Sequence, residues 1–126
     1  MSEYPKTEQL TITDEIKWIL DQKGTKRIPF AVDATNGAKL VEGCIVALDA
    51  DGKGVAWGTK TSDAYDYEPY GLLMSTADVT TEEVTLSVLT MGMVDKRRIS
   101  CVVDGGSVDD AVATLRKNNI IVEECE

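Results

Sequence analysis

Histidine is absent from this 126-residue sequence, and cysteine and proline occur only three times each. Without histidine, the chain lacks the commonest general base, the usual partner of a nucleophilic Ser or Cys, and the usual zinc ligand. The cysteines Cys44, Cys101 and Cys125 are odd in number and lie at least 24 positions apart, which fits neither a disulfide framework nor a zinc knuckle. We therefore expect no enzyme activity, no cofactor and no metal site.

Long apolar runs are also missing. No stretch approaches the roughly 20 residues that span a bilayer, and the first ten residues have neither the basic start nor the apolar core of a secretory signal. The sequence predicts a protein without a membrane partner that is synthesised in the cytoplasm.

The net charge is −9 and is unevenly distributed. Residues 1–27 contain five acids and five bases, so residues 28–126 carry the whole excess, 8 bases against 17 acids. An acidic surface repels phosphate backbones. We therefore expect no nucleic-acid partner.

The N-terminal region, residues 1–26, is interpreted as an arm with a short helix. Its first 12 residues have no helical period, although the alternation of Leu10 and Ile12 would suit an edge strand. Thr13 is a plausible N-cap, and Ile16, Ile19 and Leu20 would form the apolar face of a helix over residues 13–22. Such a helix would pack either on its own domain or on a partner.

Residues 27–126 are interpreted as one β-rich domain, because short apolar runs alternate with turns. This spacing predicts a mainly β fold, a small barrel or sandwich, with one short C-terminal helix and the short N-terminal one. Strands are predicted at residues 28–32, 44–48, 55–57, 70–74, 84–93, 99–103 and 120–122.

The C-terminal helix has the clearest signals. Ser107 is placed to cap it, with Asp110 at the capping-box spacing. Val108, Ala111, Val112 and Leu115 would form its apolar face, and residues 118–119 (Asn-Asn) allow a left-handed exit.

Two segments resemble ligand sites only superficially. Residues 49–54 begin like a calcium loop, but Lys53 and Lys60 stand where the fifth and twelfth ligands belong, so a turn is the better interpretation. Residues 105–106 (Gly-Gly) precede a helix, yet acidic residues surround them and a flexible joint is expected.

Three tyrosines, Tyr65, Tyr67 and Tyr70, lie around Pro69 in an acidic loop. Tyrosine packs well at interfaces, so this segment is either an exposed recognition loop or a loop that its own rings hold in place.

The order of these features resembles that of lambda-type bacteriophage head decoration proteins. Residues 43–52 (GCIVALDADG) resemble the Gly, apolar strand and Gly turn of that family, and residues 68–73 (EPYGLL) resemble its next block. Residues 84–94 are similar to its strand ending in Gly and an aliphatic residue, and residues 109–122 to its closing helix and strand. The similarity covers about residues 28–123.

The resemblance implies a β-tulip-like structural protein of the virion. It would bind the major capsid protein as a homotrimer on the outer capsid surface and stabilise the shell against packaged DNA. The implied capsid contact is the arm, represented here by Tyr4, Pro5, Leu10, Ile12 and Ile16.

Three other functions stay open. A phage head fibre protein shares part of the pattern, and an adhesive or glycan-binding module on the capsid would use the tyrosine loop. A trimeric all-β nucleotide hydrolase of the dUTPase type has a similar size and acidity, although its Gly-rich, Asp-bearing motifs are not visible.

Overall fold

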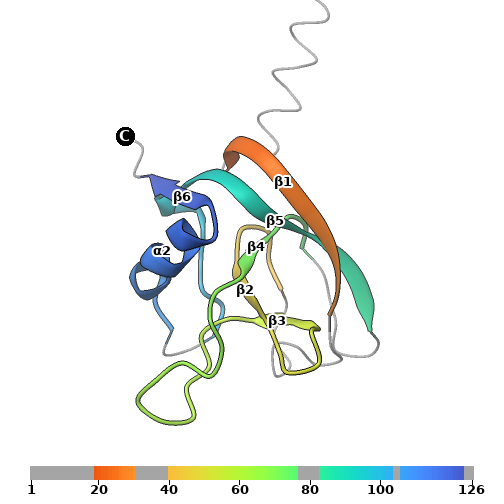
Figure 1. Ribbon diagram of the computed structural model, residues 1–126, viewed down its shortest axis with the longest axis vertical. Helices are drawn as coiled ribbons and strands as arrows, with labels where there is room; N and C mark the ends of the chain where they lie inside the picture. Colours follow the sequence, from red (N-terminus) through yellow and green to blue (C-terminus); the bar gives the residue numbers. More distant parts are fainter. Residues whose placement is uncertain (1–18, 31–39, 77–82, 104–105, 124–126) are drawn as a thin grey trace, which may run out of the picture.

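The computed structural model describes residues 19–30, 40–76, 83–103 and 106–123. These residues form a mainly β structure with an α-helix near the C-terminus (Figure 1), as the sequence predicts. In chain order the elements are β1 (Ile19–Phe30), β2 (Ile45–Leu48), β3 (Gly54–Ala56), β4 (Gly71–Leu73), β5 (Val84–Asp95), the 3₁₀ helix η1 (Lys96–Arg98), α2 (Val108–Lys117) and β6 (Ile120–Glu123).

The strands form one mixed sheet that closes on itself. Their order is β1-β3-β2-β4-β5-β6, and β1 also pairs with β5. This second pairing joins the first five strands into a ring, while β6 extends the sheet beside β5. The 12-residue strands β1 and β5 are antiparallel and cross the top of the ring together (Figure 1). By contrast, β1 meets β3 only where Phe30 lies opposite Gly54.

The predicted N-terminal helix is wrong over residues 19–22, which belong to β1. Ile19 lies opposite Val94 and packs against the core, and Gln22 lies opposite Gly92. A helix of about ten residues is marginal without tertiary contacts, whereas β5 supplies strand partners for Ile19, Asp21 and Gln22. Residues 13–18 of the predicted helix lie outside the described residues, and the division at residues 26 and 27 falls inside β1.

The predicted strand at residues 99–103 is also wrong. Only Ser100 pairs there: its carbonyl accepts from the Ile45 N–H at 2.9 Å, and its N–H donates to the Gly43 carbonyl at 3.1 Å. The chain then turns, with the Gly106 N–H donating to the Val103 carbonyl at 3.2 Å. The ladder stops after one bridge because the chain leaves the sheet to begin α2.

Two clusters of buried side chains fill the fold, and β2 contributes to both. Ile45 and Ala47 face a cluster completed by α2 and β6, while Val46 and the preceding Cys44 face a second cluster around Phe30. Because both faces of β2 are covered, residues 44–48 are apolar throughout instead of alternating with polar residues.

Helix α2 begins where the sequence predicts, with Ser107 at the N-cap position. The capping box is wrong, however: the Ser107 side chain makes no capping hydrogen bond, and the Asp110 carboxylate accepts from the Tyr65 hydroxyl instead. Ala111 and Leu115 are buried, as predicted for the apolar face. Asn119 has φ 73°, so the predicted left-handed exit is also confirmed.

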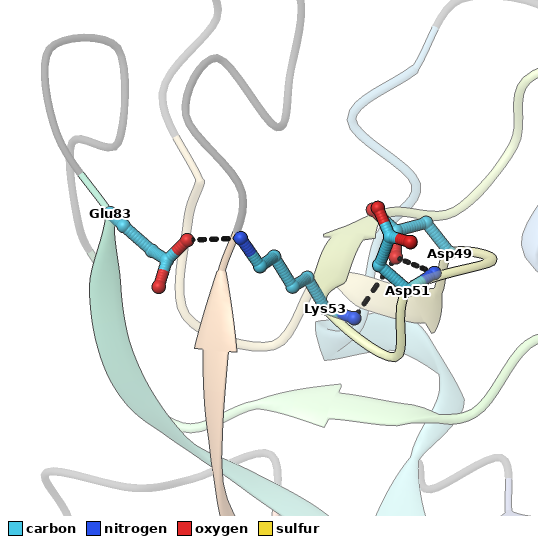
Figure 2. Close-up of polar contacts among 4 residues, drawn as sticks. All are labelled: Asp49, Asp51, Lys53 and Glu83. Carbon is cyan, nitrogen blue, oxygen red and sulfur yellow. Dashed lines mark hydrogen bonds and ion pairs between the residues drawn. The ribbon is translucent and has the colours of Figure 1, made fainter.

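The acidic segment between β2 and β3 is a tight turn, as predicted. The Asp49 carboxylate accepts from the backbone N–H groups of Asp51 at 2.9 Å and Lys53 at 3.0 Å (Figure 2). Gly52 has φ 80°, a conformation that glycine adopts easily. The Lys53 ammonium reaches across to the Glu83 carboxylate at 2.5 Å, which links the turn to the start of β5 (Figure 2).

Candidate functional site

The predicted capsid-contacting residues Tyr4, Pro5, Leu10, Ile12 and Ile16 lie outside the described residues. Their role stays a prediction. The chain enters the described structure at Ile19, whose partner Val94 also lies opposite Val122 of β6. Ile19, the first described residue, therefore lies where β1, β5 and β6 meet.

The predicted acidic loop, residues 59–69, which contains Tyr65 and Tyr67 of the predicted recognition surface, is held against the body by Tyr65. The Tyr65 ring stacks on the buried Trp57, with 4.4 Å between ring centroids and 27° between planes. Its hydroxyl donates to the Asp110 carboxylate of α2 at 2.5 Å, and the Lys60 ammonium lies 4.4 Å from its ring centroid. Tyr65 therefore ties this loop both to the core and to the helix.

Hydrogen bonds within the loop fix its shape. The Asp66 N–H donates to the Thr59 carbonyl at 2.9 Å, and the Asp66 carboxylate accepts from the Thr61 N–H at 3.0 Å. The Trp57 indole N–H donates to the Tyr67 carbonyl at 3.0 Å. A loop held this way loses little conformational entropy when it binds a partner.

The three tyrosines differ in their access to solvent. Tyr67 is 40% exposed, whereas Tyr65 is half-buried against Trp57, and Tyr70 packs against the second core cluster. Tyr65 and Tyr70 therefore hold the chain in place, whereas the Tyr67 ring is accessible to solvent. A recognition role for this segment stays a prediction.

The Tyr65 hydroxyl offers a test of this anchoring. Its hydrogen bond to Asp110 stabilises the protonated phenol and raises the pKa of Tyr65 above its usual value of 10.0. We expect Asp110→Asn to lower that pKa, because the substitution removes the carboxylate charge. Resonance positions of the tyrosine ring followed by NMR against pH would report it.

The matched control is Asp109→Asn, because the Asp109 carboxylate pairs with Lys96 at 2.6 Å and not with Tyr65. An unchanged phenol titration in Asp110→Asn would contradict the anchor.

Neither described cysteine has the environment of a reactive thiol. Burial raises the pKa of the Cys44 thiol to about 11. Burial also raises the pKa of Cys101, whose Sγ donates to the Trp57 carbonyl at 3.1 Å. Both behave as small packing groups, as the sequence suggests.

One surface was missed by the sequence interpretation. Residues 20–26 were assigned to the arm with its short helix, and Arg27 to the start of the β-rich domain. In the structure, residues 20–27 all belong to β1 and are exposed apart from Gly24. This stretch contains three cations, Lys23, Lys26 and Arg27. The only signal in the sequence was the local excess of bases, which the predicted helix obscured.

Among the described residues, no group of three or more Cys, Asp and Glu side chains is arranged to hold a metal ion. No helix in the described ranges is long and apolar enough to cross a membrane. Comparison of the sequence with protein-family models and with curated proteins found no match to either.

Proposed function

We propose that this chain is a structural protein of a bacteriophage virion that binds the outer surface of the expanded capsid as a trimer. It acts by occupying a place on the shell and stabilising it against internal DNA pressure, and not by turning over a substrate. Its binding partner is the major capsid protein.

The observation that carries the proposal is the element order of the β-rich domain. The segments that resemble head decoration proteins correspond to β2 with its glycine turn, β4, β5, and α2 followed by β6, in that order. Each local motif is common, but their ordered combination within one closed sheet is much more specific than any one of them.

The charges of the chain support an outer position. Residues 28–126 hold the whole −9 excess, and they form nearly all of the described body. A negative body is repelled by packaged DNA. Residues 1–27 are neutral overall, so this part of the chain can approach the shell without electrostatic repulsion from the DNA inside it.

Trimerisation would make weak arm contacts sufficient. A short segment that orders on binding loses conformational entropy, so one arm binds modestly. Three arms on one trimer bind with an effective concentration that raises affinity by ~10²–10⁴.

The proposal predicts that deleting residues 2–12 abolishes decoration and leaves the fold intact, because the closed sheet and both core clusters are built from residues 19–123. Purified protein would be mixed with expanded, empty heads of the phage that encodes it, and bound copies counted by electron microscopy. Light scattering of the free protein would report whether one subunit or three are present.

A variant with residues 2–12 in scrambled order is the matched control for arm length and charge. Loss of decoration in both variants identifies a sequence-specific arm. Full decoration by the deletion variant would contradict the arm as the capsid contact, and failure of the intact protein to bind expanded heads would contradict the function itself.

A further inference from the structure

The exposed side chains of β5 change from polar to apolar where β6 joins the sheet. Near the start of β5, Thr85 is exposed, and the Ser87 hydroxyl accepts from the Arg27 guanidinium at 3.3 Å. Further along the strand Met91 is 44% exposed, and Ile121 of the neighbouring β6 is 38% exposed. Single exposed apolar residues are ordinary, but here two adjacent strands present them at the same end of the sheet.

Met91 and Ile121 line one open hollow of about 540 Å³, together with Arg116, Asn119 and Glu123. This hollow lies where α2 and β6 are side by side (Figure 1). Arg116 belongs to the last turn of α2, just before β6, and Glu123 is the last residue of β6. The cation and the anion therefore flank the apolar Ile121 along the chain.

These two charges are available to another molecule. Within the described ranges, neither the Arg116 guanidinium nor the Glu123 carboxylate forms a salt bridge. One cation and one anion leave the lining of the hollow neutral, although the whole chain carries −9. Two copies of so acidic a protein repel each other over most orientations, and a neutral apolar surface is one that they can share without this repulsion.

The arrangement of the charges identifies a second copy as the occupant. A rotation that brings Ile121 of two copies together places Arg116 of one copy toward Glu123 of the other. The surface is thus complementary in charge to itself. Met91 suits such a contact, because methionine is enriched at interfaces and its flexible side chain adapts to the opposing surface.

We propose that the hollow lined by Met91, Arg116, Ile121 and Glu123 is the surface through which copies of this chain contact one another. The inference deepens the proposed function and rests on it for the number of copies, since the surface specifies a second copy and not how many assemble. A hollow of this size receives only a few side chains, so the contact is weak in solution and is favoured when a lattice holds the copies side by side.

Sedimentation equilibrium of the full chain, from micromolar to millimolar concentration, tests the apolar part. We expect the average mass to rise above one subunit. Ile121→Glu should weaken association at least tenfold, because a carboxylate would be buried between copies. The matched control is Val41→Glu, which introduces the same side chain at another exposed aliphatic position, 37% exposed and outside the hollow, and should leave association unaltered.

A charge exchange tests the polar part. Arg116→Glu and Glu123→Arg should each weaken association, and the double variant should restore it, because the ion pair between copies forms again with its charges exchanged. Circular dichroism of each variant would confirm that the fold is retained. A double variant that associates no better than the single ones would refute the pairing of these residues.

Two results would overturn the inference: a single-subunit mass at millimolar concentration, or equal association of Ile121→Glu and the unaltered protein. Decoration of expanded heads is a separate readout. If Ile121→Glu abolished decoration without changing the mass, the hollow would contact the capsid protein instead of a second copy. If the unaltered protein associated through this surface but did not decorate heads, the proposed function would fail and this inference would stand.

Discussion

Leu115→Asp is expected to destabilise the protein by about 4 kcal/mol, the effect of placing a carboxylate in a packed core. Leu115 is fully buried in the cluster that joins α2 and β6 to the sheet. The aspartate would lose the apolar contacts of leucine and would have to be desolvated or protonated. Since a domain of this size is stable by roughly 5–15 kcal/mol, the variant would lose a large part of its stability and would unfold at a much lower denaturant concentration.

Denaturant unfolding followed by circular dichroism would measure this loss. Ala113→Asp introduces the same side chain at an exposed position of the same helix and is the matched control. We expect that control to shift stability by less than about 1 kcal/mol. Equal midpoints for the two variants would mean that α2 does not pack through Leu115.

Gly92→Ala is expected to cost about 3 kcal/mol, because the added methyl group has no space. Gly92 is buried in β5 opposite Gln22 of β1, and a Cβ at this position would overlap the carbonyl oxygen of Asp21. To relieve this steric overlap, the backbone of β1 would have to move away from β5. The Gly92 N–H also donates to the Asn119 carbonyl at 3.0 Å, so β6 would be disturbed as well.

The control is Gly24→Ala on the facing strand, where a Cβ would lie 3.4 Å from the Met91 Cβ, an ordinary contact. Thermal unfolding of both variants would separate a steric effect from a general effect of replacing glycine. If Gly92→Ala were as stable as Gly24→Ala, residues 19–22 would not form a strand against β5, and the helix predicted there would deserve reconsideration.

Most of the described fold follows from local sequence patterns. Residues 44–48 were predictable as a buried strand because they are uniformly apolar between turn residues, and α2 because its apolar residues recur at helical spacing. The turn at residues 49–54 was predictable from Asp and Gly at positions that favour side-chain hydrogen bonds and φ > 0.

The site was only partly predictable. The sequence placed three tyrosines in one segment, but it could not show that Tyr65 would stack on Trp57. Nor could it show that the Asp110 carboxylate, 45 positions later, would accept a hydrogen bond from the Tyr65 hydroxyl. These contacts depend on the packing of α2 beside the loop, and no local sequence pattern indicates which residues of two distant segments will be in contact.

By itself, the sequence determined the β-rich class, the position of α2, the acidic surface and the turn chemistry, because each follows from propensities acting over a few residues. Only the tertiary structure decided the state of residues 19–22 and the fate of residues 99–103. The sequence patterns of both segments are compatible with more than one conformation, and tertiary contacts determine which one forms. Residues 19–22 pair with β5, whereas the chain turns after Ser100 toward α2, so residues 99–103 do not continue as a strand. The exposure of residues 20–27 on β1 follows from its pairing with β5, since strand pairing is a property of two distant segments and not of either one alone.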